Sequence, residues 1–524
     1  MHWSEKIARE IVARAPEKEM YVCAAGTSPS GSIHIGNFRD IATSLFVCRS
    51  LIAIGKKAKL LLSWDDFDRL RKVPVNVQAI TQGFEEHIGK PYADCPDPFG
   101  CCSSYAEHFE KEYENSLKKF GIELEIRYQT KEYRSGRYSD AIIESLQKRF
   151  EICDILAQFR TQGFTEEERQ NYYPVSIYCP VCGKDYTKIT SLSSDCKVAE
   201  YRCSCGHSGT FDFTKDFNCK LAWKIDWPMR WRAEGVDFEP GGKDHASPGG
   251  SYQTSKIISE QVFNFPAPIF QGYEFIGIKG ATGKMSGSTG LNLTPDTLLN
   301  LYQPEVILWL YSKSEPNKAF DFCFDDEILR QYFEFDKMYS AVAQGTADEY
   351  ASDIIRLAYA LDRKLYTVPM AQLVSLGSVV DFNPETLEKL FEKIGTPFKQ
   401  EEFAERLKLA KYWLEICSPE NMNTLKAEKD TEFFASLSNE EQQEIKVLHK
   451  YLANEQYTMD ELMAYLYDIP RQVFGELTPK ELKNKQATFF SNVYKLLIDK
   501  TKGPRLYLFL YAIEKDRYLK LLDF

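Results

Sequence analysis

The sequence predicts an α/β protein built on a parallel β-sheet, with a metal-binding insertion and an all-α region after it. Three observations predict this fold class. A strand, a glycine-rich turn, a helix and a second strand follow one another near the N-terminus; cysteines gather in two clusters; and long helical patterns replace glycines after residue 290. At 524 residues the chain has length for about three to four domains. The length therefore excludes a single compact module.

The composition is that of a folded globular protein with an acidic surplus. Hydrophobic residues make up 44% and charged residues 27%, which is enough apolar content to bury cores. Lys and Arg number 65 against 76 Asp and Glu, a net charge of −11. This balance disfavours a protein that coats nucleic acid through a uniformly basic surface, so we expect no DNA partner. An RNA partner would have to be met by a local patch.

The first twenty residues are charged throughout and carry Trp3, Ile7 and Ile11 at helical spacing. This pattern predicts an amphipathic helix and lacks the apolar stretch of a signal peptide. No window approaches the roughly 18 consecutive apolar residues that a membrane span needs. We therefore expect a soluble, cytoplasmic protein with no membrane partner.

A β-α-β unit follows directly. Residues 21–25 form a short apolar strand, 26–32 are small turn formers, 33–54 are largely apolar at helical length, and 60–64 form a second apolar strand. The crossover should be right-handed and the strands parallel, which predicts a Rossmann-type nucleotide-binding sheet. Ligands of such sheets bind at the carboxyl ends of the strands, so the turn at 26–32 is where chemistry is expected.

The start of the helix after this turn suits a phosphate. Its unpaired backbone N–H groups and helix dipole favour an anion. His34 can add a hydrogen bond to developing negative charge, Gly36 leaves room for a base or ribose, and Asn37 offers a neutral donor. A histidine that only begins a helix is the alternative interpretation of the triplet.

A second candidate segment lies about 250 residues further on, at 283–290. Lys284 is flanked by glycines and followed by Ser286 and Ser288, and such a loop can close over a pyrophosphate leaving group. A solvated Gly/Ser turn is the alternative.

Taken together, PSGSIHIGN (29–37) and GKMSGS (283–288) resemble the HIGH and KMSKS signatures of class I aminoacyl-tRNA synthetases. The blocks at 63–74, 224–231, 241–250 and 277–288 look like those of the class I lysyl-tRNA synthetase family. The resemblance implies a lysine–tRNA ligase. Such an enzyme activates L-lysine with ATP and Mg²⁺, releases pyrophosphate, and esterifies the 2′-hydroxyl of the terminal adenosine of tRNA(Lys). Asn37 stands for the usual second His, and Gly287 for a second Lys, which leaves open what else neutralises the pyrophosphate.

The same resemblance assigns roles to these segments. It implies catalytic roles for His34, Asn37, Lys284, Ser286 and Ser288, and ATP contacts for Pro29, His34, Gly36, Asn37, Asp244 and Lys284. Asp244 would bind the ribose of the adenosine.

A lysine substrate needs carboxylates for its ammonium groups and an apolar or aromatic wall for its stem. Asp65, Asp66 and Asp68 follow the second strand at its carboxyl end, and Trp223, Trp227 and His245 lie in later blocks that return to the sheet. By resemblance, residues matching Gly26, Ser28, Trp223 and His245 line the amino-acid site. The expected lysine-binding residues are therefore Gly26, Ser28, Asp65, Asp66, Trp223 and His245. An N-cap and solvated loop is the alternative for the Asp cluster.

The cysteine clusters predict two structural zinc sites. In a chain of this length without a signal peptide, clustered cysteines are more typical of metal ligands than of disulfides. Cys179, Cys182, Cys203 and Cys205 give a tetrahedral S₄ pattern, with His207 as the alternative to Cys205. Asp97, Cys101, Cys102 and His108 form a second cluster that is weak on spacing, and a zinc site of this kind in the lysyl family supports it.

The C-terminal half reads as helical, and by resemblance it would be an α-helix cage that reads the anticodon; a scaffold or dimerisation bundle is the alternative. Residues 381–470 carry 10 Lys and Arg against 19 Asp and Glu, whereas residues 471–524 carry 11 against 6. The domains expected are the first half of the catalytic sheet at 1–90, a zinc-binding insertion contacting the tRNA acceptor end at 91–220, the second half of the catalytic sheet at 221–293, a helical stem-contact domain at 294–380 and an anticodon-binding domain at 381–524.

Other functions remain as alternatives. The enzyme alternatives are a glutamyl- or cysteinyl-like class I synthetase and a small-molecule adenylyltransferase. The non-enzyme alternative is a catalytically inactive, synthetase-like RNA-binding protein, which would be expected to have lost residues of the two signatures.

Overall fold

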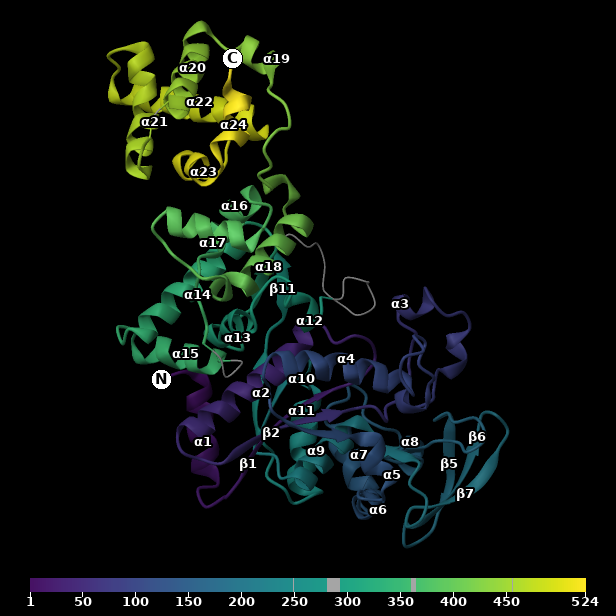
Figure 1. Ribbon diagram of the computed structural model, residues 1–524. Coiled ribbons are helices and arrows are strands. Elements are labelled where there is room, and N and C mark those ends of the chain that lie inside the picture. Colours follow the sequence, from purple (N-terminus) through teal and green to yellow (C-terminus); the bar gives the residue numbers. More distant parts are fainter. Residues whose placement is uncertain (248, 280–292, 360–363, 455) are drawn as a thin grey trace. The chain divides into compact units, whose positions relative to one another are not determined.

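The computed structural model describes residues 1–247, 249–279, 293–359, 364–454 and 456–524 (Figure 1). They form two compact units. The first comprises residues 1–299, 303–322 and 338–362, and the second comprises residues 300–302, 323–337 and 363–524. Within the described ranges, no helix combines the length and apolarity needed to cross a membrane.

The first unit is built on a five-stranded parallel sheet with the strand order β10-β9-β1-β2-β3. The strands are β1 Tyr21–Thr27, β2 Ala58–Trp64, β3 Glu125–Tyr128, β9 Phe238–Gly242 and β10 Ile269–Tyr273. The chain places β2 and β3 on one side of β1 and returns to the other side with β9 and β10. The strand order thus reverses between β1 and β9, and the carboxyl ends at this point are where such sheets bind ligands. The predicted Rossmann-type sheet is confirmed.

Helices cover both faces of the sheet, because alternate residues of a strand point to opposite faces. Val22 and Ala24 of β1 pack with Trp227 and Trp231 of α9 (Trp223–Glu234) on one face. On the other face lies α2 (Ile35–Ala53), in which 13 of 19 residues are buried. The predicted N-terminal helix is α1 (Trp3–Arg14), which packs on α2.

Between the sheet strands the chain forms smaller elements. After β2 come α3 Val75–Gln78, the 3-10 helices η1 Phe84–His87 and η2 Tyr92–Asp94, and α4 Tyr105–Lys119. After β3 come α5 Gln129–Arg134, α6 Ser139–Gln147, α7 Arg149–Ala157, α8 Glu166–Gln170, β4 Val175–Ile177, β5 Thr187–Leu192, β6 Val198–Cys203, β7 Ser208–Asp212 and β8 Cys219–Leu221. Strands β5, β6 and β7 form an antiparallel sheet (Figure 1). Strand β4 pairs with β8.

Two sequence-based boundaries differ from the structure. Residues 91–220, expected to be an insertion, contribute β3 to the edge of the main sheet. This strand is short and none of its residues is fully buried, so its sequence lacks the apolar run that would have revealed it. Residues 294–380, expected to be helical, contain the strand β12 (Phe320–Cys323), which pairs with β11 (Ile276–Lys279).

The remaining described elements are helical, as the sequence predicts for those after residue 290. In the chain after β9 these are α10 Lys243–Ala246, α11 Ser251–Gln261, α12 Pro295–Leu298, α13 Pro304–Lys313, α14 Glu327–Ala343 and α15 Glu349–Ala358. The second unit contains α16 Met370–Val379, α17 Pro384–Lys393, α18 Gln400–Ile416, η3 Pro419–Asn421, α19 Thr431–Ser436, α20 Asn439–Asn454, α21 Met459–Phe474, α22 Pro479–Ile498, α23 Leu506–Ala512 and α24 Lys515–Leu522. Leu448, Leu466, Phe489 and Tyr518 belong to an apolar core shared by α20, α21, α22 and α24.

Candidate active site

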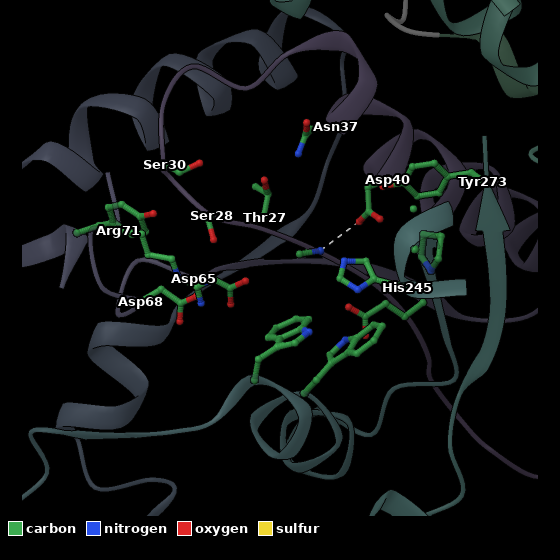
Figure 2. Close-up of a pocket in the computed structure, with 18 residues that line it drawn as sticks. Thr27, Ser28, Ser30, Asn37, Asp40, Asp65, Asp68, Arg71, His245 and Tyr273 are labelled. Carbon is green, nitrogen blue, oxygen red and sulfur yellow. Dashed lines mark hydrogen bonds between the residues drawn. The ribbon is translucent and has the colours of Figure 1, made fainter. Parts of the chain in front are cut away.

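A cavity of about 430 Å³ opens at the carboxyl ends of β1, β2 and β9, where the strand order reverses (Figure 2). We call it the acidic cavity, because four carboxyl side chains line it. Asp65, Asp68 and Arg71 lie on one side of it and Asp40, His245 and Tyr273 on the other, as Figure 2 shows. The described residues that line it are Gly26, Thr27, Ser28, Ser30, Asn37, Asp40, Asp65, Asp68, Arg71, Tyr92, Trp223, Trp227, Glu239, Pro240, Gly241, Gly242, His245 and Tyr273.

The turn between β1 and α2 is shaped by His34. This residue is the N-cap of α2, and its Nδ1 accepts a hydrogen bond of 3.0 Å from the backbone N–H of Gly36. A Cβ at Gly36 would lie 2.8 Å from Cε1 of His34. Gly36 therefore makes room for the imidazole ring, whereas the sequence had suggested room for a base or ribose. Because Nδ1 accepts, the neutral ring carries its proton on Nε2.

Two of the lining carboxyls belong to a buried charge network. Asp65 pairs with Arg230 at 2.8 Å, and Asp68 pairs with Lys220 at 2.5 Å. Both cations also pair with Asp226, which is fully buried, at 3.1 and 3.2 Å. Burial raises the pKa of Asp65, while the guanidinium of Arg230 opposes this shift. The network holds three carboxyls against two cations and so has an acidic surplus of one.

The other two carboxyls, Asp40 and Glu239, are held without an ion pair to any described residue. Asp40 accepts a hydrogen bond of 3.2 Å from the N–H of Gly26, and Glu239 accepts one of 2.6 Å from Nε1 of Trp231. Burial raises the pKa of both carboxyls, and the neighbouring Glu239 raises that of Asp40 further. This end of the cavity would bind a cation, because an ammonium group would offset the burial penalty of the ionised carboxyls.

Aromatic rings form a wall of the cavity. Trp223 and Trp227, one turn apart on α9, stack with ring centroids 5.1 Å apart, and the ring of His245 lies 5.7 Å from that of Trp227. Nε1 of Trp223 is buried and has no hydrogen-bond partner in the described part of the chain. Burial lowers the pKa of His245, which keeps its imidazole neutral at pH 7. The wall suits an aliphatic stem, with neutral polar atoms at hand.

Some expected residues lie elsewhere. Asp66 does not line the cavity, because its Oδ1 accepts a hydrogen bond of 2.9 Å from the N–H of Thr130; burial raises its pKa to about 6. Asp244 is exposed on α10 outside the cavity lining, and Pro29 and Gly36 do not line it either. Lys284, Ser286 and Ser288 lie outside the described residues. The expected Gly26, Ser28, Asn37, Asp65, Trp223 and His245 are brought together.

The sequence missed Asp40, Glu239 and Tyr273 as lining residues, and Lys220 and Arg230 behind the cavity. Asp40 had one available signal, since a single carboxyl in the apolar stretch FRDIATSLFV is unusual for a buried helix. Glu239 and Tyr273 had none, because each belongs to a short strand, β9 or β10, that carries no recognisable pattern.

A second cavity, of about 410 Å³, adjoins the first. The two share Ser28, Ser30, Asn37, Arg71 and Tyr92 in their linings. His34, Lys72 and Ser32 line only the second, which we call the phosphate-side cavity. No carboxyl side chain of the described residues lines it, so it is basic where its neighbour is acidic.

Both predicted metal clusters are assembled. The Sγ atoms of Cys179, Cys182, Cys203 and Cys205 lie within 4.8 Å of one another, and His207 is not part of this group. Four soft thiolates brought together by two turns match the tetrahedral preference of Zn²⁺.

In the second group, one ligand atom each of Asp97, Cys101, Cys102 and His108 lies within the same limit. Oδ2 of Asp97 accepts hydrogen bonds of 2.7 Å from the N–H groups of Cys101 and Cys102, and Phe99 stacks on His108 at 4.1 Å. These contacts fix the turn that carries the donor atoms, so this mixed set also fits a structural Zn²⁺.

Comparison with known proteins gives consistent matches. The family described as tRNA synthetases class I (K) matches residues 1–360. A lysine–tRNA ligase of Streptomyces coelicolor is 34% identical over 569 residues, covering 99% of this chain and 98% of the relative. One of Pyrococcus horikoshii is 34% identical over 538 residues, covering 100% and 99%. One of Treponema pallidum is 34% identical over 537 residues, covering 100% and 98%.

Proposed function

The chain belongs to the class I lysyl-tRNA synthetase family, ATP-dependent lysine–tRNA ligases, and on this premise we propose that the acidic cavity holds L-lysine during its activation. The reaction joins the lysine carboxylate to the α-phosphate of ATP and releases pyrophosphate. The lysyl group then passes to the 2′-hydroxyl of the terminal adenosine of tRNA(Lys).

The charge of the cavity is the observation that carries this proposal. Asp40, Asp65, Asp68 and Glu239 line it, and Arg71 is the one Lys or Arg among its described lining residues. A substrate with two ammonium groups matches this surplus, whereas glutamate would add a carboxylate to an already acidic site.

The position of the phosphate-side cavity sets the orientation of the substrate. The reacting carboxylate must face the cavity that receives ATP, which adjoins at Ser28, Ser30 and Arg71. The ε-ammonium then reaches the opposite end, where Asp40 and Glu239 have no competing ion pair among the described residues. Trp223 and Trp227 cover the aliphatic stem between the two ends.

The two signature segments act on ATP in this proposal. His34 donates from Nε2 to a phosphate, and Asn37 donates from its amide. Lys284, Ser286 and Ser288 close over the pyrophosphate, and Asp244 accepts from the ribose. Mg²⁺ accompanies ATP and neutralises part of the triphosphate charge.

The metal and RNA assignments rest on donor chemistry and charge. We propose that each metal group holds one structural Zn²⁺, because each supplies four donor atoms and so leaves no coordination position open. We also propose that residues 91–220 contact the acceptor end, 294–380 the stem and 381–524 the anticodon of tRNA(Lys). The surplus of Lys and Arg, 11 against 6 Asp and Glu in 471–524, supports the last assignment.

The test is amino-acid-dependent ATP–pyrophosphate exchange with a panel of lysine, arginine, ornithine, glutamate and cysteine, with and without tRNA(Lys). Lysine should give the highest kcat/KM. Asp40→Asn and Glu239→Gln should each raise the KM for lysine by about tenfold or more, because each removes one charge from the ammonium site, while the KM for ATP changes little.

Glu10→Gln is the matched control, since Glu10 is an exposed carboxyl of α1 that lines neither cavity. Exchange with another amino acid in place of lysine would overturn the specificity. An unchanged KM for lysine in both variants would overturn the placement of the ε-ammonium.

A further inference from the structure

The segment that follows β2 presents two neighbouring cations to the phosphate-side cavity. Leu70 and Val73 are buried in a small core with Phe84 and Tyr105, whereas Arg71 and Lys72 between them are exposed. Packing therefore fixes which residues of the segment face the core. Rotating the backbone to move Arg71 and Lys72 away would expose Leu70 and Val73 to solvent.

Backbone hydrogen bonds hold this segment in place. The N–H of Leu70 donates to the carbonyl of Lys90 at 2.8 Å, and the N–H of Gly89 donates to the carbonyl of Leu70 at 2.9 Å. The N–H of Tyr92 donates to the carbonyl of Asp68 at 2.9 Å. These hydrogen bonds fix the backbone that carries the two cations. A fixed backbone suits a residue that must bind its ligand in one geometry.

Across the cavity from these cations lies the β1–α2 turn. Ser28, Ser30, Ser32 and His34 line the same cavity as Arg71 and Lys72, and no carboxyl of the described residues does. Hydroxyls, an imidazole and two cations around one space are the donors that a polyanion requires. Arg71 also lines the acidic cavity, so it lies at the junction of the two cavities.

The described structure gives neither cation a direct side-chain partner, although the charge of Arg71 opposes the rise that burial causes in the pKa of Asp185. Arg71 and Lys72 make no ion pair, side-chain hydrogen bond or ring contact there, whereas Arg69, two residues earlier, pairs with Asp185 at 3.1 Å. The comparison is informative because all three are exposed residues of one short segment. Arg69 already pairs with Asp185, whereas Arg71 and Lys72 line the phosphate-side cavity.

We propose that Arg71 and Lys72 bind the triphosphate of ATP, with Arg71 at the α-phosphate and Lys72 at the departing pyrophosphate. In the step itself, a lysine carboxylate oxygen forms a bond to the α-phosphorus. The bond from that phosphorus to the bridging oxygen breaks, and its electron pair leaves with pyrophosphate. The two cations offset the charge that builds on the phosphate oxygens. The proposal rests on the proposed function and supplies two cations in addition to Lys284, since Gly287 carries no charge.

The test is lysine-dependent ATP–pyrophosphate exchange by the full chain at saturating Mg²⁺ and tRNA(Lys), with kcat and both KM values measured separately. Arg71→Ala should lower kcat by about 100-fold, because it meets the reacting phosphate. Lys72→Ala should lower kcat and raise the KM for ATP, each by about tenfold, because it meets the leaving group. Arg71→Lys should recover part of the loss. Arg69→Ala is the matched control and should leave all three constants within about twofold.

Three outcomes would overturn the proposal. If kcat and the KM for ATP of Arg71→Ala and Lys72→Ala both stay within about twofold of the parent, the two cations do not bind ATP. A change confined to the KM for lysine would mean that Arg71 only balances Asp65 and Asp68. A loss confined to transfer from preformed lysyl-adenylate would place the cations on the phosphates of the tRNA end.

Failure of the proposed function has a separate signature. It would appear as exchange by the parent protein with an amino acid other than lysine, or with none. Binding of a non-hydrolysable ATP analogue, measured by calorimetry, would still report on Arg71 and Lys72 in that case, and unchanged affinity in both variants would contradict the proposal.

Discussion

At the scale of single residues, the site depends on charges that the protein buries and then partners. Asp226 is fully buried and accepts a short hydrogen bond from the hydroxyl of Tyr133 while it pairs with Lys220 and Arg230. Removing one partner of a buried ion pair costs about 3–5 kcal/mol of stability. Substituting any one of these residues is therefore expected to destabilise the whole network. Their role is to hold Asp65 and Asp68 in fixed positions in the cavity lining.

Another buried carboxyl, Glu444 of α20, makes stability depend on pH. It is 1% exposed, its Oε1 has no hydrogen-bond partner in the described ranges, and burial raises its pKa from 4.5 to about 8. The folded state thus binds more protons than the unfolded state between these values. The stability that this proton provides is complete below pH 4.5 and is lost as the pH rises towards 8.

We therefore expect Glu444→Gln to flatten this dependence. The variant should gain about 1–3 kcal/mol over the parent at pH 8 and little at pH 4.5, because the amide never ionises. Thermal unfolding followed across this pH range checks it. Glu440→Gln, an exposed carboxyl on the same helix, should leave the pH dependence unchanged.

At the scale of elements, one turn and one packed segment position the groups around the phosphate-side cavity. The β1–α2 turn places a histidine and hydroxyls beside the cavity, and the packed segment after β2 places the opposing cations. The donor residues of both metal groups lie in or next to turns. Cys179 and Cys182 lie in the turn between β4 and β5, and Cys203 and Cys205 at the turn between β6 and β7. A bound ion there would join these two turns next to the hydrophobic core that β4 to β7 share.

We expect two zinc ions per chain by elemental analysis of the purified protein. Cys205→Ser should leave one ion, because its Sγ belongs to the four-thiol group, whereas His207→Ala should retain both. Cys101→Ser should remove the other ion independently. Loss of an ion in His207→Ala with full content in Cys205→Ser would reverse the ligand assignment.

At the scale of the whole molecule, charge is distributed unevenly along the chain. The net charge of −11 conceals a C-terminal stretch, 471–524, with a surplus of five positive charges, while residues 381–470 carry a deficit of nine. An acidic protein can thus present a local basic surface to one RNA without attracting polyanions in general. Binding through this stretch should weaken as salt rises.

Charge reversal in this stretch should separate RNA binding from activation. Lys502 and Arg505 are exposed, and Lys502→Glu with Arg505→Glu should raise the KM for tRNA(Lys) about tenfold or more in aminoacylation. Pyrophosphate exchange at saturating tRNA should change little. Lys408→Glu, an exposed lysine of α18, is the control. An equal effect of all three substitutions would indicate a general charge effect instead of a local contact.

The sequence by itself determined the β-α-β unit, the cysteine groups and the residues of the two signatures, because these depend on local period, spacing and short-range turns. It placed α2 and the flanking strands to within about two residues at each end. It also named Asp65, Trp223 and His245 as neighbours, since the carboxyl ends of parallel strands meet at one edge.

Only the tertiary structure decided which carboxyls face the cavity. Asp65 and Asp66 are adjacent in sequence, yet one lines the cavity and the other bonds to Thr130. Asp40 on α2 and Glu239 on β9 are about 200 residues apart and share no motif, yet Glu239 raises the pKa of Asp40. Arg69 and Arg71 differ in the same way, since Arg69 pairs with Asp185 and Arg71 lines the phosphate-side cavity. Side-chain direction and long-range pairing follow from packing between distant segments, and local sequence holds no record of them.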